Sequence, residues 1–180
     1  EKALKKLHNL QKEDFLNIFK ILNGDEANIR LLDPPVHEFL PKTLEDKEKM
    51  AEILSISLED VEKRIYRLKD ENPMLGHRGC RLGVSYPELY KIQARAIIEA
   101  AYECAKKGIK VHPEIMIPFI MEAKELAYLR KEIEEEIESF FKEVGEKVEY
   151  KLGTMIEIPR ACLLANEIAE YADFFSFGTN

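Results

Sequence analysis

The sequence predicts an α/β fold in which parallel strands alternate with helices, and three observations support this prediction. Short continuous apolar runs, such as residues 29–32 and 115–117, alternate with longer segments of helical periodicity. These runs lack polar–apolar alternation, which favours strands buried on both faces, as in parallel sheets. Short links join about five strand–helix units, a pattern that fits either an open doubly wound sheet or part of an eight-stranded barrel.

The first half of the chain contains three predicted helices and one strand. Residues 1–22 have helical periodicity. Their apolar stripe consists of Leu4, Leu7, Phe15, Ile18, Phe19 and Leu22. A strand is expected at about residues 28–33, because the two prolines that follow it stop the apolar run. Two further helices are expected near residues 44–54 and 58–69, and Ser57 provides a cap-like start for the second.

The second half repeats the pattern of helix and strand. A helix at about residues 86–107 ends in Lys106, Lys107 and Gly108, the basic last turn and glycine that commonly stop a helix. The remaining predicted elements are a strand at 113–118, a helix at 122–144, a strand at 150–157, a helix at 159–170 and a terminal strand from residue 174.

The composition excludes several classes of protein. The 180 residues suffice for one ordinary domain, and a net charge of -7 argues against a general nucleic-acid binder. Three cysteines without Cys-x-x-Cys spacing argue against a zinc site or a disulfide framework and indicate a reducing compartment. No run approaches the roughly 20 apolar residues of a membrane helix. The expected location is cytoplasmic, with an organelle left open because the first residue is Glu1 rather than Met.

Residues 76–83 are the most informative segment of the chain. They read Gly-His-Arg-Gly-Cys-Arg-Leu-Gly and directly precede a helical pattern. Glycines let a backbone approach a ligand closely, and guanidinium groups bind phosphate or carboxylate through two parallel hydrogen bonds. The segment therefore indicates an anion site, with an ordinary surface turn as the alternative.

Two further residues carry charge in or beside apolar strands. Arg30 lies inside the run of residues 29–32, where an unpaired charge would be costly to bury. It either forms a structural ion pair with Asp33 or points into a cavity at the strand end. Glu157 ends another strand, just before Pro159 starts a helix. Its carboxylate fits either a salt bridge or a hard metal ion.

Polar groups thus recur near the ends of successive predicted strands. They are Arg30 with Asp33, Arg78 with Arg81, Glu157, and Thr179 with Asn180. In a barrel, the ends of different strands converge on one mouth. This convergence predicts a site for an anionic small molecule, with room for a divalent cation. Neither Gly-x-Gly-x-x-Gly nor a Walker sequence follows any strand, so no nucleotide fingerprint is met.

At these residues the chain resembles the pyruvate, phosphate dikinase family, from about residue 3 to the end. Five motifs carry the resemblance: Ile-Arg-Leu-Leu-Asp-Pro-Pro from residue 29 with His-Glu-Phe-Leu-Pro from 37, the segment 76–83, Glu-Ile-Met-Ile-Pro from 114, Gly-Thr-Met-Ile-Glu from 153, and Phe-Phe-Ser-Phe-Gly-Thr-Asn from 174. The related phosphoenolpyruvate synthases share the barrel but differ in the strand that carries Arg30.

The resemblance implies a larger protein with an ATP-grasp domain, a swivelling phosphohistidine domain and a C-terminal barrel that binds phosphoenolpyruvate or pyruvate. Residues 1–180 would all belong to that single barrel domain, as an incomplete TIM-type (β/α)8 barrel of roughly strands 2 to 6 with their helices. The resemblance also implies Mg2+ as cofactor, a homodimeric parent protein, and neither nucleic acid nor membrane as partner.

The resemblance assigns roles to particular residues. Arg30 and Arg78 match the catalytic arginines that bind the phosphoryl group and the substrate. Glu157 matches a magnesium ligand that also lies at the substrate, and Thr179 and Asn180 match substrate contacts. The family's reaction converts ATP, phosphate and pyruvate reversibly to AMP, pyrophosphate and phosphoenolpyruvate. The part implied here supports phosphoryl transfer between phosphohistidine and pyruvate enolate.

Several parts of the family site are missing from these 180 residues. A further substrate arginine would precede Glu1, and the second magnesium carboxylate would follow Asn180. The cysteine that protonates the enolate would lie further on, in a Cys-Gly-Glu context absent here. The isolated chain is therefore expected to be inactive. A phosphoenolpyruvate synthase-like enzyme and a non-catalytic anion-binding or assembly module remain alternatives, which the parent reading frame would distinguish.

The cysteines are expected to be structural. Neighbouring arginines would lower the thiol pKa of Cys80. The catalytic cysteine of the family, however, belongs to a different strand. Cys104 and Cys162 lie in helical patterns and are expected to be small core residues.

Overall fold

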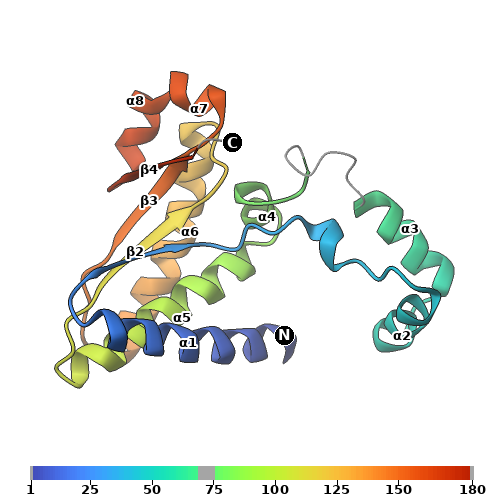
Figure 1. Cartoon of the computed structure of the whole chain (residues 1–180), viewed down its shortest axis with the longest axis horizontal. Coiled ribbons are helices and arrows are strands. Elements are labelled where there is room, and N and C mark those ends of the chain that lie inside the picture. Colours follow the sequence, from blue (N-terminus) through green and yellow to red (C-terminus); the bar gives the residue numbers. More distant parts are fainter. Residues whose placement is uncertain (1, 69–75, 179–180) are drawn as a thin grey trace. The chain divides into compact units, whose positions relative to one another are not determined.

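The computed structural model describes residues 2–68 and 76–178 of the chain. Its internal contacts divide the chain into two compact units, and each is described by itself. The first unit comprises Glu1–Asp33 and Gly79–Asn180, and the second comprises Pro34–Arg78. Figure 1 labels the elements in chain order.

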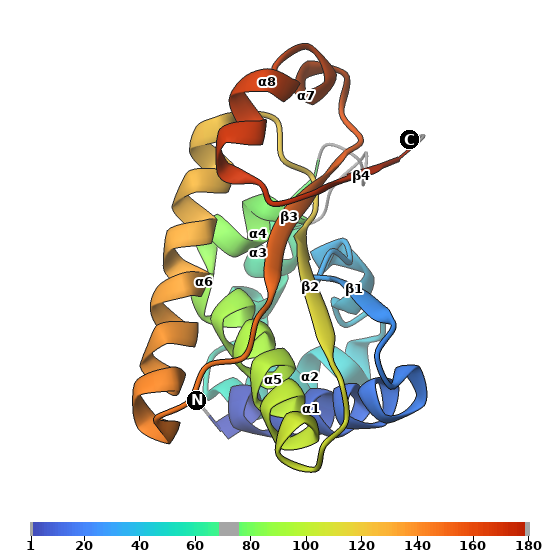
Figure 2. The same ribbon diagram turned by 90° about the vertical axis from the view of Figure 1, so that its left-hand side faces the viewer.

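The first unit is built on a curled parallel sheet that forms half of a barrel wall (Figure 2). Its strands, in both sequence and spatial order, are β1 (Glu26–Arg30), β2 (His112–Ile117), β3 (Lys151–Ile156) and β4 (Phe175–Phe177). All three neighbouring pairs are parallel. A doubly wound sheet would reverse the strand order at a switch point, whereas sequential order is that of a barrel. The structure therefore favours the incomplete barrel.

About five strand–helix units were expected; residues 2–68 and 76–178 contain four strands, and residues 69–75 lie outside the described part of the chain. Between β1 and β2 the described part of the chain is helical or irregular, so Arg78 and Arg81 do not follow a strand there. The physical reason lies in the spacing of apolar residues. Over residues 58–68 they recur at helical intervals, as at Val61 and Ile65, which favours a helix over a strand.

Three long helices accompany the sheet of the first unit. They are α1 (Lys2–Leu22), α5 (Pro87–Lys106) and α6 (Ala123–Val144), and α5 packs against both of the others. The short helix α4 (Cys80–Ser85) precedes α5. Helix α6 starts with a capping box between Glu122 and Glu125 and ends at Gly145, whose φ of 76° is left-handed. The predicted limits of residues 122–144 are thus confirmed.

The helix predicted at residues 159–170 is shorter than expected. Instead of one helix, the chain forms α7 (Pro159–Leu163), α8 (Ala165–Ile168) and the 3-10 turn η2 (Ala169–Tyr171). The break lies at Leu164, whose φ of -106° and ψ of 16° leave the helical region. Cys162 is exposed here, so its expected place in the core was wrong, whereas Cys104 on α5 is buried.

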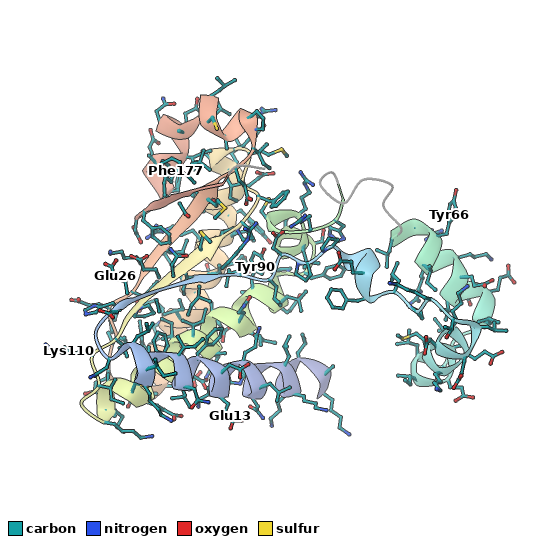
Figure 3. All side chains as sticks on the ribbon, in the orientation of Figure 1. Glu13, Glu26, Tyr66, Tyr90, Lys110 and Phe177 are labelled. Atoms are coloured by element: carbon teal, nitrogen blue, oxygen red, sulfur yellow. The ribbon has the colours of Figure 1, made fainter. Side chains whose placement is uncertain are left out.

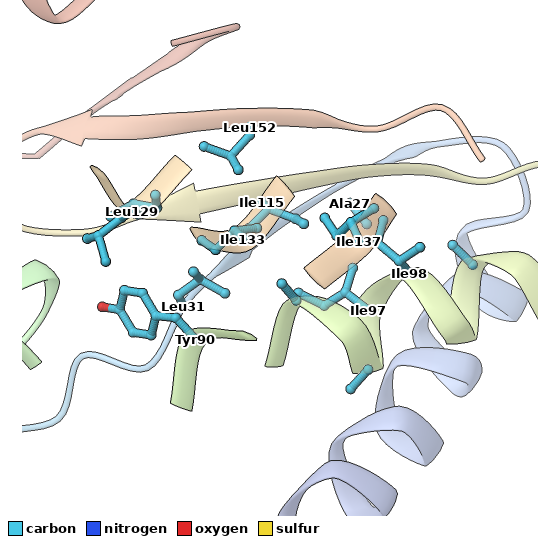
Figure 4. Close-up of a cluster of buried hydrophobic side chains, with 14 of the residues drawn as sticks. Ala27, Leu31, Tyr90, Ile97, Ile98, Ile115, Leu129, Ile133, Ile137 and Leu152 are labelled. Carbon is cyan, nitrogen blue, oxygen red and sulfur yellow. The ribbon is translucent and has the colours of Figure 1, made fainter. Parts of the chain in front are cut away.

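The two faces of the sheet differ in chemistry. One face packs against the helices in a continuous apolar core (Figure 4). Its members include Ala27, Ile115 and Leu152 from the strands and Ile97, Ile98, Leu129, Ile133 and Ile137 from the helices. Alternate residues point to the opposite face, where Asn28, Glu114 and Lys151 share one register level and Arg30, Met116 and Gly153 share another. Strand β1 is therefore not apolar on both faces as predicted, and its polar face carries Arg30.

The second unit contains the 3-10 turn η1 (Val36–Phe39) and the helices α2 (Leu44–Leu54) and α3 (Leu58–Leu68). The hydroxyl of Ser57 accepts a hydrogen bond from the Asp60 amide at 3.1 Å, which confirms the cap expected for the second helix. None of the described helices combines the length and apolar character needed to cross a bilayer.

Candidate functional site

The carboxyl ends of β1 and β3 bring together one arginine and two carboxylates. Arg30 is the last residue of β1, and Glu157 directly follows β3. Arg30 Nη2 donates to Asp33 Oδ2 at 2.6 Å and to Glu157 Oε1 and Oε2 at 3.1 and 3.2 Å. The expected ion pair between Arg30 and Asp33 is therefore confirmed, and the guanidinium lies at the strand ends, whereas a cavity there stays a prediction.

The cluster is only partly accessible to solvent. The Glu157 side chain is fully buried, the Asp33 side chain is 10% exposed, and that of Arg30 is 35% exposed. A buried carboxylate needs compensating donors, and Glu157 receives them from Arg30 and from the Phe119 amide, which lies 2.9 Å from Glu157 Oε1. The arginine is thus the member of this cluster that a ligand in solvent reaches first.

Arg30 has donors that these carboxylates do not use. Its Nη1 faces the Met155 sulfur at 3.7 Å, which is a weak acceptor. Its Nε is buried and has no hydrogen-bond partner among the described residues. A guanidinium prefers strong, bidentate acceptors such as carboxylate and phosphate oxygens. The arrangement therefore suits a further anion beside Met155.

Two buried polar residues that the sequence did not single out support the loop after β1. Gln93 Oε1 accepts a hydrogen bond from the Leu32 amide at 2.8 Å, and the Tyr90 hydroxyl donates to the Leu32 carbonyl at 3.0 Å. Both residues lie on α5, and Tyr90 is labelled in Figure 3. Burial raises the pKa of Tyr90 above its ordinary value, so its hydroxyl stays a donor. The available signal was two polar residues three positions apart on an otherwise apolar helix face.

The glycine–arginine segment enters the first unit at Gly79. The Cys80 amide donates to the Pro118 carbonyl at 3.0 Å, and the Cys80 thiol donates to the Phe119 carbonyl at 2.9 Å. Burial raises the pKa of the Cys80 thiol to about 12, so it stays protonated near neutral pH. This geometry supports the structural reading of Cys80, because the nucleophilic thiolate is suppressed.

Three other residues were expected at the site, namely Arg78, Thr179 and Asn180. Arg78 is the last residue of the second unit, where its amide donates to the Gly76 carbonyl at 3.1 Å. Its expected role at the substrate stays a prediction. Thr179 and Asn180 lie outside the described residues.

The described residues do not form a metal centre by themselves. Carboxylates are the ligands that Mg2+ prefers, and Glu157 and Asp33 have the right donor chemistry. Both, however, accept hydrogen bonds from Arg30, and no group of three or more candidate ligands gathers within the described ranges. A magnesium ion would require ligands beyond these two side chains.

The fold and this strand-end site agree with a known class of domains. A family model described as "PEP-utilising enzyme, PEP-binding domain" matches residues 1–180. The chain belongs to this family, where PEP is phosphoenolpyruvate. The match confirms the class of domain that the strand-end motifs had indicated.

Several relatives narrow the resemblance to one kind of enzyme. The chain is 51% identical over 179 residues to "Pyruvate, phosphate dikinase" of Rhizobium meliloti (strain 1021), covering 99% of the chain and 20% of the relative. It is 49% identical over 181 residues to the protein of the same name from Clostridium symbiosum, covering 100% and 21%.

A plant protein is equally similar. The chain is 50% identical over 182 residues to "Pyruvate, phosphate dikinase 1, chloroplastic" of Oryza sativa subsp. japonica, covering 100% of the chain and 19% of the relative. The resemblance to pyruvate, phosphate dikinases is thereby confirmed. The chain spans about a fifth of the length of these relatives.

Proposed function

We propose that this chain is part of the phosphoenolpyruvate- and pyruvate-binding domain of a pyruvate, phosphate dikinase. The parent protein would convert ATP, phosphate and pyruvate reversibly to AMP, pyrophosphate and phosphoenolpyruvate. The observation that carries the proposal is Arg30, held at the strand ends by Asp33 and Glu157 with donors to spare. The identity of about half of all positions to dikinases, over the whole chain, supports it.

Arg30 and Arg78 are the proposed catalytic residues and bind the phosphoryl group and the substrate. Arginines at such positions neutralise the negative charge that spreads over a transferring phosphoryl group. Asp33 and Glu157 hold the Arg30 guanidinium in one orientation, so little of its freedom is lost when the anion binds. Thr179 and Asn180 complete the proposed substrate contacts.

Glu157 is also the proposed ligand for Mg2+ in the complete protein. When bound, the ion supplies charge stabilisation to enolate and carboxylate oxygens. The family resemblance supports this role, and further ligands would come from parts of the protein beyond the described residues. Glu157 itself keeps Arg30 in place and retains the Phe119 amide as a second donor.

The proposal extends to the architecture and partners of the parent protein. The 180 residues would form part of a single TIM-type barrel domain, corresponding to roughly strands 2 to 6. A swivelling phosphohistidine domain would deliver the phosphoryl group, and the parent would be a homodimer without nucleic acid or membrane partners. A cytoplasmic location is proposed, with an organelle for proteins of the kind named chloroplastic.

The test compares the two half-reactions of the full-length protein. Arg30→Ala and Arg78→Ala should each slow phosphoryl transfer between phosphohistidine and pyruvate by about 100-fold, since a charge-assisted contact to the transferring group is worth on the order of 3 kcal/mol. Phosphorylation of the histidine by ATP should continue at the normal rate.

Arg95→Ala is a matched control for these variants. Arg95 on α5 pairs with Glu99, Glu136 and Glu143, three carboxylates of the helix layer. Its loss should leave both half-reactions intact. Equal damage to both half-reactions in Arg30→Ala would instead point to misfolding and contradict the proposed role.

A further inference from the structure

Phe119, two residues after the end of β2, has an unusual backbone conformation. Its φ is 65°, although its large side chain is only 1% exposed. The other described non-glycine residues with positive φ are Asn23 and Ser55, both polar and exposed or half-buried at helix ends. Bulky residues rarely adopt this conformation, and where they do the surroundings must enforce it.

The left-handed turn directs the two polar backbone groups of Phe119 to two different partners. Its amide donates to Glu157 Oε1 at 2.9 Å, the carboxylate oxygen that also contacts Arg30. Its carbonyl accepts a hydrogen bond at 2.9 Å from the thiol of Cys80, the first residue of α4. Phe119 therefore contacts both the Glu157 carboxylate and Cys80 of the glycine–arginine segment.

Gly79 fits closely against the same residue. A Cβ atom at Gly79 would lie 2.7 Å from Phe119 Cβ and 3.0 Å from Asp33 Oδ1, and the φ of Gly79 is 56°. Only glycine allows this approach and this φ together without strain. The Arg81 guanidinium lies over the Phe119 ring, 5.9 Å from its centre, so the side chain of Phe119 also contacts the glycine–arginine segment.

We propose that Phe119 is a positioning residue for the site. Its amide fixes the Glu157 carboxylate, and its carbonyl fixes the Gly79–Cys80 turn that directly follows Arg78 in the chain. The Arg30-binding carboxylate and the start of α4 are thereby held in one arrangement. The effect on catalysis rests on the proposed function. The link from Glu157 through Phe119 to Cys80 does not, because it consists of the two hydrogen bonds of the Phe119 backbone.

The carbonyl contact is tested by Cys80 variants of the full-length protein. Cys80→Ala removes the donor to Phe119, whereas Cys80→Ser retains one. Cys104→Ala is the matched control, because Cys104 is also buried but its thiol faces the Leu16 carbonyl, 3.9 Å away in the helix layer. Two quantities are measured: hydrogen–deuterium exchange of the peptide containing Phe119, and kcat and KM of the half-reaction with pyruvate.

Cys80→Ala should speed exchange at Phe119 by about five- to tenfold and lower kcat of the pyruvate half-reaction by a similar factor, as expected for one lost hydrogen bond. KM and the ATP half-reaction should change little. Cys80→Ser should restore both exchange and kcat to within about twofold of the parent protein, and Cys104→Ala should leave them unchanged.

Two outcomes overturn the inference. One is a Cys80→Ala protein that behaves like Cys104→Ala in exchange, and the other is faster exchange with an unchanged kcat. Failure of the proposed function would look different, because Arg30→Ala would then also leave the pyruvate half-reaction intact.

Discussion

At the amino ends of the strands Lys151 pairs with Glu26 and Glu114, whereas at the carboxyl ends Arg30 pairs with Asp33 and Glu157. Both clusters place one cation between two carboxylates on the polar face of the same sheet. Glu26 at the amino end is labelled in Figure 3. The clusters nevertheless differ in how completely their polar groups are used.

The amino-end cluster is mutually satisfied and open to solvent. Lys151 is 50% exposed and lies 3.1 Å from Glu26 Oε1 and 2.9 Å from Glu114 Oε1. The second oxygen of Glu114 accepts a hydrogen bond from Asn28 at 3.2 Å. Hydrogen bonds to Glu114 and Glu26 raise the pKa of Lys151. A pocket of about 610 Å3 adjoins this cluster, and the cluster's own charges on its wall, Lys151, Glu26 and Glu114, already pair with one another.

The carboxyl-end cluster combines full burial of one carboxylate with unused donors on the cation. Glu157 is buried completely, while Nη1 of Arg30 has only a thioether as partner among the described contacts. The two ion clusters at the strand ends are therefore not equivalent. The proposed site is placed at the carboxyl ends because Arg30 has unused donors there, and barrel active sites generally lie at that end.

The largest expected effect comes from removing the buried charge at the carboxyl ends. Glu157→Gln should lower the free energy of unfolding by about 3 kcal/mol, because Arg30 loses its buried partner. It should also reduce the pyruvate half-reaction to near background. Urea denaturation and half-reaction assays of the full-length protein measure both effects. Wild-type activity of Glu157→Gln would show that the carboxyl-end cluster is no more important for the reaction than the amino-end cluster.

A smaller effect is expected when the Arg30 charge is kept but its shape is changed. Arg30→Lys should slow the pyruvate half-reaction by about tenfold, less than Arg30→Ala, since an ammonium group keeps the charge but cannot form the bidentate contact to an anion. Lys151→Arg is the reciprocal exchange at the amino ends and should leave the rate unchanged. Rapid-quench measurement of phosphoryl transfer gives both rates, and similar rates for the two variants would break the comparison.

The Cys80 thiol gives a pH-dependent prediction near the carboxyl-end cluster. Its pKa rises from 9.0 to about 12 on burial, so the unfolded chain loses this proton first as the pH increases. The contribution to stability is therefore complete below about pH 9 and is lost progressively between pH 9 and 12, with a slope of up to about 1.4 kcal/mol per pH unit.

Cys80→Ser should flatten this decline, measured by urea denaturation between pH 8 and pH 11. Cys162→Ala, at an exposed position, should not. An unchanged slope in Cys80→Ser would show that other groups, such as the buried Tyr90 with its raised pKa, dominate the alkaline loss of stability.

The smallest effect is expected at the amino ends. Glu114→Gln should lower the free energy of unfolding less than Glu157→Gln does, because the ion pair with the exposed Lys151 is weak and the amide can still accept from Asn28. Both half-reactions should be unaffected. Loss of activity in this variant, with normal stability, would assign function to the amino ends as well.

Much of the framework followed from the sequence. The strands and the helix over residues 122–144 were identified because apolar spacing and end signals such as Gly145 act locally. A fifth strand–helix unit is not found among the described residues, where α2 and α3 of the second unit lie between β1 and β2 in the chain. The core position of Cys162 was also wrong, since the predicted helix breaks at Leu164 and leaves this side chain exposed.

By itself, the sequence determined the alternation of strands and helices, the family motifs and the expectation that Arg30 pairs with Asp33, because all of these depend on residues close in the chain. Only the tertiary structure decided that Glu157, 127 positions from Arg30, joins the same guanidinium. It alone also showed the left-handed Phe119 between Glu157 and Cys80. These contacts depend on strand register and on the path of loops between strands, and no local pattern of residues specifies either.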